Sequence, residues 1–254
     1  MTRLLAALAV ASLLVPAARA QDGVDAKTLE ILKKTGALYK DAAAMHAELL
    51  IDGVFDLEGQ NKREIKVRGE IDFKRPNLIS IRTTGITDSN LGAEVVSDGK
   101  NLSTHLRRTK QYTEKKAPEN LAEIGRIILP LGQATTGMLF QNVLAEDPTD
   151  QLLEGVTEGK YAGMDKVGDK PAHHLTFKQP NLDWEIWVAA EGKPFILKAK
   201  SQMELPNGKL SSVETYSNWK VNPTFEKDPF QFKAPEGAKK VERLGRPASS
   251  DDDK

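Results

Sequence analysis

The sequence predicts a mainly β protein built on a single curved antiparallel sheet, with one helix before the sheet and a helical insert across its concave face. Apolar and polar residues alternate with a period of two in roughly ten segments, and short turn sequences join most of them. Residues of helical spacing interrupt this pattern between Pro118 and Leu153. One-sided polarity with hairpin connections favours one continuous sheet over two domains.

The start of the chain has the pattern of a signal peptide. Arg3 precedes an apolar run from Leu4 to Val15, and small residues stand at Ala18 and Ala20. The run is too short to span a bilayer comfortably. We therefore expect cleavage before Gln21.

The whole chain is expected to divide into a signal peptide over residues 1–20, one sheet domain over 21–247 and a disordered acidic tail over 248–254. After residue 20, no apolar run approaches the roughly 18 residues of a membrane-spanning helix. The sequence thus predicts a periplasmic protein.

Composition excludes several classes of function. Lysine plus arginine equals aspartate plus glutamate at 36 each, so no net charge draws the chain to nucleic acid or to an acidic membrane, although local patches remain open. Without cysteine there is no disulfide and no thiolate chemistry. His173 and His174 fall in a strand pattern, which points their rings to opposite faces. Since no familiar catalytic motif occurs either, we expect no metal, no cofactor and no enzymatic activity.

The first element of the domain is a helix that packs on the sheet. Asp25 suits its N-cap position, and buried-type residues at helical spacing continue to about Tyr39. From His46 onward the period changes to two.

The segment from Glu64 to Lys74 has the clearest strand pattern, with apolar side chains at odd positions around Gly69 and charged ones at even positions. Arg75 has the parity of the apolar set. An unbroken strand would point this arginine toward the apolar side, near the rim.

Further strands are expected from the same alternation, with tight turns at residues 97–100, 191–194 and 206–209. These strands cover roughly 78–84, 93–97, 101–107, 110–115, 172–178, 183–189, 195–205 and 210–219. In the strand 195–205, the residues Phe195, Leu197, Ala199, Met203 and Leu205 share one parity.

The helical insert holds more apolar surface than one helix face needs. Pro118 suits a first helical turn, apolar residues follow at helical spacing to Leu131, and a second piece runs from about Thr135 to Leu144. The insert either forms part of the core or serves as a hinged cover over something apolar.

Two segments resemble the outer-membrane lipoprotein carrier family of the Lol sorting pathway. GEIDFKRPNLISI (69–81) and VVSDGKNL (95–102) match that family's strand and following hairpin, and FQFKAPEGAKKVERL (230–244) is similar to its closing strand. The chain departs from the family in the basic stretch NLSTHLRRTKQYT (101–113) and in the longer hairpin TTGITDSNLGA (83–93). These departures affect the identity of the ligand more than the fold.

The resemblance implies an open half-barrel that binds acyl chains on its concave side under a short helical lid. The family's functional arginine falls on Arg75, which would hydrogen-bond the lid backbone and act as a lid latch. The alternative is an arginine that reaches solvent or caps the strand end.

We therefore expect a monomeric periplasmic carrier for lipid or lipoprotein acyl chains, with an inner- or outer-membrane protein as a further partner. The expected ligand-binding residues are Leu49, Ile51, Phe55, Ile65, Val67, Ile71, Phe73 and Ile81 on the sheet, with Ile128, Met138, Leu139 and Phe140 on the lid. Alternation alone does not separate a cavity from a filled core. An envelope sensor or scaffold that binds a protein partner is the second hypothesis, and an enzyme the third.

Overall fold

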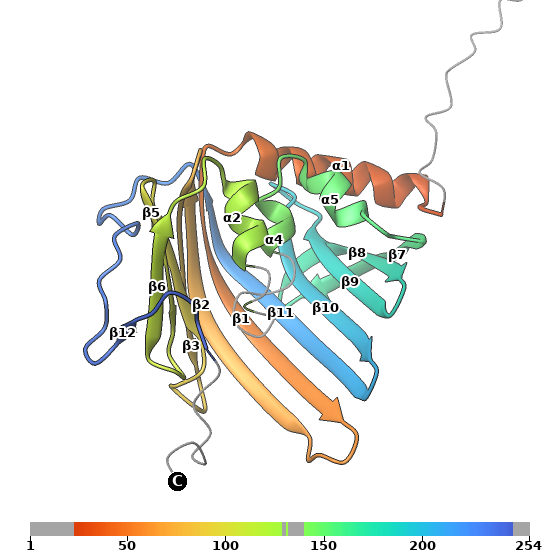
Figure 1. Ribbon diagram of the computed structural model, residues 1–254. Helices are drawn as coiled ribbons and strands as arrows, with labels where there is room; N and C mark the ends of the chain where they lie inside the picture. The colour runs from red at the N-terminus through yellow and green to blue at the C-terminus, as the bar shows by residue number, and fades with distance from the viewer. Residues whose placement is uncertain (1–22, 129–130, 132–139, 246–254) are drawn as a thin grey trace, which may run out of the picture.

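The computed structural model describes residues 23–128, 131 and 140–245 of the chain (Figure 1). The expected signal peptide, the cleavage before Gln21 and the tail 248–254 lie outside the described residues, as do Met138 and Leu139.

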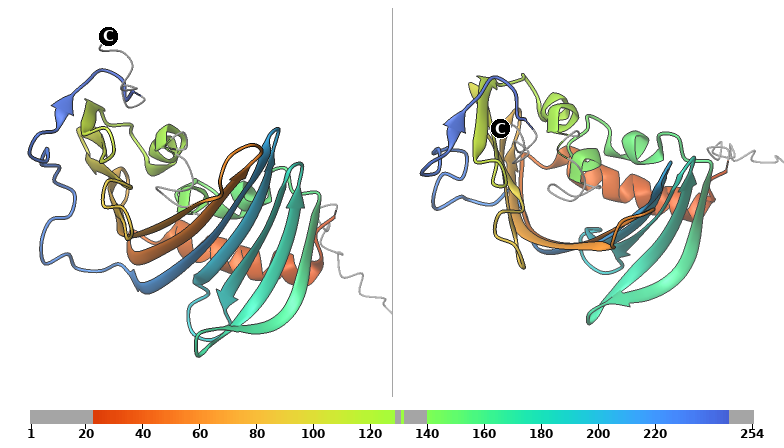
Figure 2. Two further views of the ribbon diagram at one scale, coloured as in Figure 1. Left: turned by 90° about the horizontal axis from the view of Figure 1, so that it is seen from below. Right: turned by 60° about the horizontal axis from the view of Figure 1, so that its bottom comes forward.

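The prediction of a mainly β protein with one curved sheet is confirmed. Twelve strands form a single sheet in the order β12-β6-β5-β4-β3-β2-β1-β11-β10-β9-β8-β7. All pairs are antiparallel except β12 with β6. The sheet bends strongly without closing, so that β12 and β7 are its two edges (Figure 2).

The strands agree with the expected segments to within a few residues. They are β1 (Ala44–Leu57), β2 (Arg63–Lys74), β3 (Leu78–Gly85), β4 (Ala93–Asp98), β5 (Asn101–Leu106), β6 (Gln111–Lys116), β7 (Glu158–Val167), β8 (Lys170–Gln179), β9 (Leu182–Ala189), β10 (Ile196–Leu205), β11 (Gly208–Val221) and β12 (Lys239–Lys240).

The tight turn between β4 and β5 shows how local chemistry sets the hairpins. The Asp98 carboxylate accepts hydrogen bonds from the backbone N–H groups of Lys100 and Asn101, and Gly99 has a φ of 88° that favours glycine. These backbone donors, that of Asn101 first, lower the pKa of Asp98 below its ordinary value.

The expected first helix is α1 (Ala26–Asp41), and Asp25 is its N-cap as predicted. The Asp25 carboxylate accepts from the backbone N–H of Thr28 at 2.8 Å, as an N-cap does. At the other end Tyr39 is fully buried, and its hydroxyl oxygen accepts from the backbone N–H of Ile196 in β10 at 2.9 Å. The helix is thus joined to the C-terminal strands.

The helical insert contains α2 (Leu121–Ile128), α4 (Phe140–Val143) and α5 (Pro148–Leu153). Together with α1 these helices gather on the concave side near one end of the strands, while the β1–β2 and β10–β11 hairpin tips extend beyond them (Figure 1). Side chains of the helices and of the inner sheet face belong to one continuous hydrophobic core.

The C-terminal segment corrects one expectation. Residues 230–237 form no strand; the backbone carbonyls of Pro229 and Gln231 instead accept from the Arg82 guanidinium, and Phe230 is buried. Pairing resumes only in the short β12, parallel to β6. Pro229 and Pro235 lack the N–H group that a ladder needs, so the closing strand implied by the resemblance does not form here.

Candidate functional site

The eight sheet residues predicted to bind a ligand lie on the same face of β1, β2 and β3. The register pairs Ile51 with Val67 and Ile71 with Ile81, and the alternation of the strands places the others on that side. This is the concave side, which we call the inner face, because six of the eight, all except Phe55 and Ile65, pack with the helices in one core. The sequence pattern therefore brought together residues that are close in space.

Two of the predicted residues of the insert cover this face. Phe140 of α4 lies against Phe73 of β2, with ring centroids 6.4 Å apart, and Ile128 at the end of α2 belongs to the same core. Both are almost completely buried.

Around these residues the interior is packed. The predicted sheet residues are buried except Phe55, which is half-buried toward the hairpin tip. The space enclosed by Tyr39, Phe140, Val143, Ile196, Tyr216 and Trp219 amounts to about 170 Å³ and has no room for a water molecule. In the part of the chain that the structure describes, the predicted residues other than Phe55 and Ile65 form close-packed core between sheet and helices, and the role of the whole set in binding stays a prediction.

A polar group on the inner face was missed from the sequence. Ser201 of β10 pairs in register with Trp184 of β9 on one side and with Ser212 of β11 on the other, and the two serine hydroxyls are 2.9 Å apart. Glu214 follows Ser212 on the same face and is buried to 1% exposure. The Tyr216 hydroxyl donates to the Glu214 carboxylate at 2.6 Å. We call these five residues the polar row.

The polar row has two unusual electrostatic features. Burial, followed by the nearby Glu214 carboxylate, raises the pKa of Tyr216 well above its ordinary value of 10.0. The indole Nε1 of Trp184 is buried and has no hydrogen-bond partner among the described residues. The only signal in the sequence was the parity of Ser201, Ser212 and Glu214, which matches the apolar positions of their strands.

The expected parity of β10 holds for only part of the strand. A register shift between Ile196 and Lys198 turns Leu197 to the convex side, where it packs with Ala172 and Trp187. Ala199 and Ser201 face inward beyond the shift. A single extra residue thus divides the set that the sequence placed on one face.

Arg75 lies at the apolar rim beside Phe73, as its parity predicted, with the guanidinium carbon 5.7 Å from the ring centroid. Its Nε donates to the carbonyl of Ala42 and its Nη2 to that of Tyr39, both at 3.2 Å. These carbonyls lie at the C-terminal end of α1, where a helix leaves acceptors unpaired and favours a cation. Burial lowers the pKa of Arg75 from its ordinary value.

The contacts that the described residues give Arg75 therefore differ from the expected contact with the lid. They join β2 to α1, whereas residues 129–130 and 132–139 of the insert lie outside the described chain. The role of Arg75 as a lid latch stays a prediction.

The histidines offer no shared site. His173 contacts the Tyr161 hydroxyl at 3.2 Å, while His174 stacks on Trp187 and contacts Glu185 at 2.7 Å, so the two rings point to opposite faces as predicted. Within residues 23–128, 131 and 140–245, no cluster of three or more histidine or acidic side chains is arranged to hold a metal ion.

A family model described as "Predicted periplasmic protein (DUF2092)" matches residues 28–244, which include every described strand and helix apart from the first two residues of α1. The chain belongs to the DUF2092 family. It is a periplasmic protein, as the sequence predicted. None of the described helices of this DUF2092 member is long and apolar enough to cross a membrane.

Three solved structures illustrate what this chain is similar to. The Mycobacterium tuberculosis lipoprotein LppX has 16% identity, with 80% of this chain and 100% of that chain covered and a TM-score of 0.47. The LolA superfamily protein NE2245 from Nitrosomonas europaea has 12% identity, coverages of 81% and 97% and a TM-score of 0.34. MucB in the Pseudomonas aeruginosa MucA/MucB complex has 14% identity, coverages of 82% and 62% and a TM-score of 0.42.

The second of these structures is described as a LolA superfamily protein. A search of curated proteins gave no match to this DUF2092 member.

Proposed function

We propose that this protein binds an acylated lipoprotein or another lipidic ligand on the inner face of its sheet and transfers it across the periplasm. The observation that supports the proposal is the continuous apolar surface of β1, β2 and β3 under the apolar side chains of α2 and α4. We propose a carrier rather than an enzyme, since the sequence contains no familiar catalytic motif.

The energetics of acyl chains explain why such a carrier needs both a sheet and a cover. At about 0.8 kcal/mol for each buried methylene, a chain of about fifteen carbons represents on the order of 10 kcal/mol of transfer from water. A sheet alone would shield one side of that chain. A ligand enclosed between sheet and helices is kept from aggregating or from entering the nearest membrane.

The space enclosed between the described residues is too small for a hydrocarbon chain, so we infer that ligand entry requires the insert to move away from the sheet. The acyl chain then takes the place of side chains such as Phe140 against Phe73. Apolar contacts with the ligand replace apolar contacts within the protein, so the exchange costs little free energy.

Polar contacts near the two ends of the insert hold it to the rest of the fold. The Asn77 side-chain amide donates to the carbonyl of Pro118 at 2.8 Å, and Lys40 of α1 forms an exposed ion pair with Asp147 at 2.9 Å. Exposed pairs of this kind contribute little. We infer that such ends allow the part between them to separate from the sheet.

Arg75 serves this function through α1. Its guanidinium fixes the carbonyls of Tyr39 and Ala42, and the Tyr39 ring borders the same enclosed space as Phe140. Arg75 therefore positions the surface on which the insert closes. Arg75 thus acts on the lid indirectly, through the end of α1.

The polar row provides the chemistry to recognise the polar part of the ligand. The indole N–H of Trp184, which has no partner in the part of the chain that the structure describes, and the two serine hydroxyls are donors for a carbonyl oxygen, such as that of the ester or amide at the head of an acyl chain. Bound hydrocarbon would lie toward β1–β3 and the carbonyl toward β9–β11.

The test is lipid extraction and native mass spectrometry of the protein purified from the periplasm. We expect bound acyl-containing molecules, and we expect their recovery to fall in a Phe73→Asp variant that still folds. Protein that carries no lipid after purification, and that takes up no fatty acyl probe when refolded with one, would contradict the proposal.

One observation favours a second function, the binding of a protein partner by an envelope sensor or scaffold. An open groove of about 690 Å³ crosses the convex side over β11, β1, β2 and β3, with Leu50 exposed among Glu48, Arg68, Glu70 and Arg82. A Leu50→Asp variant that loses a co-purifying protein while it keeps bound lipid would support this second function.

A further inference from the structure

One edge of the sheet carries cations that the overall neutrality of the chain conceals. The segment Arg107–Lys116 contains five basic residues and one carboxylate, while the whole chain has 36 of each. Net charge taken over the full sequence therefore gives no sign of a local field.

Folding adds a further lysine to this edge. The backbone N–H of Lys239 donates to the carbonyl of Lys110 at 2.8 Å, which places β12 beside the β5–β6 turn. We define the basic edge as Arg108, Lys110, Lys115, Lys116 and Lys239, all of which are exposed.

The cations of the basic edge are not neutralised by neighbours. None of the five forms a salt bridge with a described residue, whereas Lys240 is paired with Glu114 at 2.7 Å and Arg107 with Glu94 at 2.9 Å. The other carboxylates of the C-terminal segment beside β6 are Glu236 and Glu242, both exposed. Because these two negative charges are fewer than the five cations that pair with no described residue, the edge keeps an excess of positive charge.

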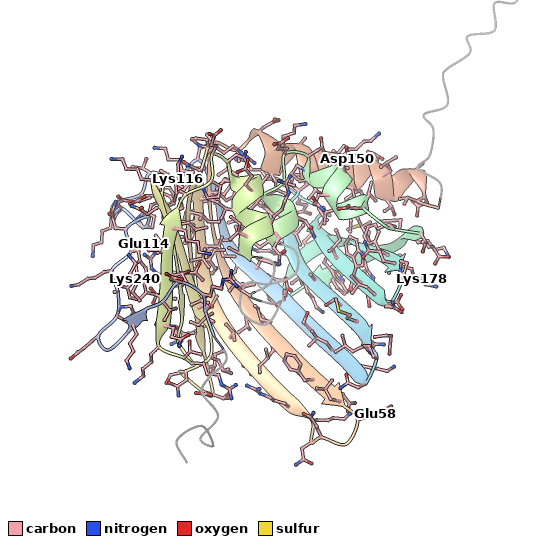
Figure 3. All side chains as sticks on the ribbon, in the orientation of Figure 1. Glu58, Glu114, Lys116, Asp150, Lys178 and Lys240 are labelled. Carbon is pink, nitrogen blue, oxygen red and sulfur yellow. The ribbon has the colours of Figure 1, made fainter. Side chains whose placement is uncertain are left out.

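The opposite edge of the sheet is different. There Lys160 and Lys178 share the carboxylate of Glu158, at 3.1 and 3.4 Å. Figure 3 shows Lys178 on that side of the molecule and Lys116, Glu114 and Lys240 on the other. The lysines of the opposite edge that pair with no described residue, Lys166 and Lys170, each follow an aspartate in the sequence, so that edge has no comparable excess of positive charge.

An exposed apolar side chain lies at the same end of the strands as the β5–β6 turn. Ile86, at the start of the β3–β4 loop, is 50% exposed, and the end of this loop leads into Ala93, which pairs with the last residue of β5 just before the turn. Arg107 connects the two, because its backbone N–H donates to the carbonyl of Gly92 in the loop and its Nε to the carbonyl of Thr83 in β3. Cations beside an exposed aliphatic group are typical of a surface that rests on a bilayer of anionic lipids.

We propose that the basic edge, with Ile86, docks this protein on an anionic membrane surface. The lysine and arginine side chains contact lipid phosphates, and Ile86 enters the interface between headgroups and acyl chains. A soluble polyanion would use the cations alone. The surface is distinct from the inner face, so docking needs no bound ligand and its test is independent of the proposed carrier function.

The test uses vesicles of phosphatidylglycerol and phosphatidylcholine in equal parts, compared with vesicles of phosphatidylcholine alone, in a co-sedimentation assay. We expect binding to the anionic vesicles only, and its loss near 1 M salt, where screening shortens the range of the field to about 3 Å. The triple variant Arg108→Gln, Lys110→Gln and Lys239→Gln should bind roughly a hundredfold more weakly, since each cation near such a surface contributes about fivefold. Ile86→Ser should weaken binding further with no change in salt dependence.

A matched control removes three exposed lysines elsewhere, Lys166, Lys170 and Lys193, and should bind as the unmodified protein does. Equal binding to both kinds of vesicle would overturn the proposal. So would a triple variant that retains anionic-vesicle binding, a control that loses as much, or binding to soluble polyphosphate without binding to vesicles.

Discussion

The strands β1–β3 and β9–β11 face the same concavity with different chemistry. Aliphatic and aromatic side chains such as Ile51, Ile71 and Phe73 fill the inner face of the first group. The second group adds the Ser201–Ser212 pair and the buried Glu214 to its apolar members. The first surface makes non-directional apolar contacts, whereas the second makes hydrogen bonds that require a partner in a given place. The two groups should therefore respond differently to substitution.

The largest effect is expected in the apolar group. Phe73→Ala removes a fully buried ring that lies against Phe140, and should lower the free energy of unfolding by about 3–5 kcal/mol through lost burial and a new cavity. Urea denaturation followed by circular dichroism measures this. The exposed Ile86→Ala is the control and should stay within about 0.5 kcal/mol. A loss under about 1 kcal/mol for Phe73→Ala would mean that this interior is loosely packed.

The next effect sharpens the contrast through pH. The folded-state pKa of Tyr216 is raised above its unfolded value, so the stability it contributes is complete below about pH 10 and is lost as pH rises toward the folded pKa. Above pH 10 the loss should be about 1.4 kcal/mol for each pH unit. Tyr216→Phe removes this part of the alkaline loss. The prediction would be contradicted if the free energy of unfolding fell equally between pH 9 and 11.5 in the unmodified protein and in Tyr216→Phe.

A smaller effect is expected where the apolar group meets α1. Arg75→Leu removes two hydrogen bonds to the end of the helix, and should cost about 1–2 kcal/mol while the sheet stays folded. Amide exchange should quicken at residues 39–42, and ligand retention should change. Arg75→Lys keeps the charge but lacks the planar guanidinium donors, so its free energy of unfolding should lie between those of the unmodified protein and Arg75→Leu. Global unfolding without a separate binding defect would remove the positioning role.

The smallest change in stability is expected at Trp184. Trp184→Phe deletes an indole N–H that no described residue accepts, and the gain offsets part of the lost stacking on Phe177, so stability should change by about 1 kcal/mol at most. Under the proposed function, recovery of acyl ligands should fall while that of plain hydrocarbon probes does not. Equal retention of both by the variant would exclude a carbonyl contact at this residue.

Much of the fold could be predicted because alternation is a direct image of a sheet with one buried face. Ile65, Val67, Ile71 and Phe73 needed only their parity to be placed together, and Asp25 only its capping chemistry. These are local signals, and the structure confirms the face and the helix start that they predicted.

What could not be predicted depends on contacts between distant segments. The register shift before Lys198 moves Leu197 to the other face without any mark in the sequence. Arg75 reaches the carbonyls of α1 because α1 ends there in space, and Lys239 joins the basic edge because β12 pairs with β6. Whether an apolar interior is full or hollow depends on the cover, which parity does not describe.

The meeting of α1 and α5 at Gly36 offers a handle on the motion that a carrier needs. A Cβ atom at Gly36 would lie 2.0 Å from Oγ1 of Thr149, so even one methyl group there acts as a wedge between the two helices. Gly36→Ala would push α5 away from α1 and so displace the attachment of the insert at Asp147, which directly precedes α5. The insert could then be held away from the sheet without a change to any side chain of the inner face.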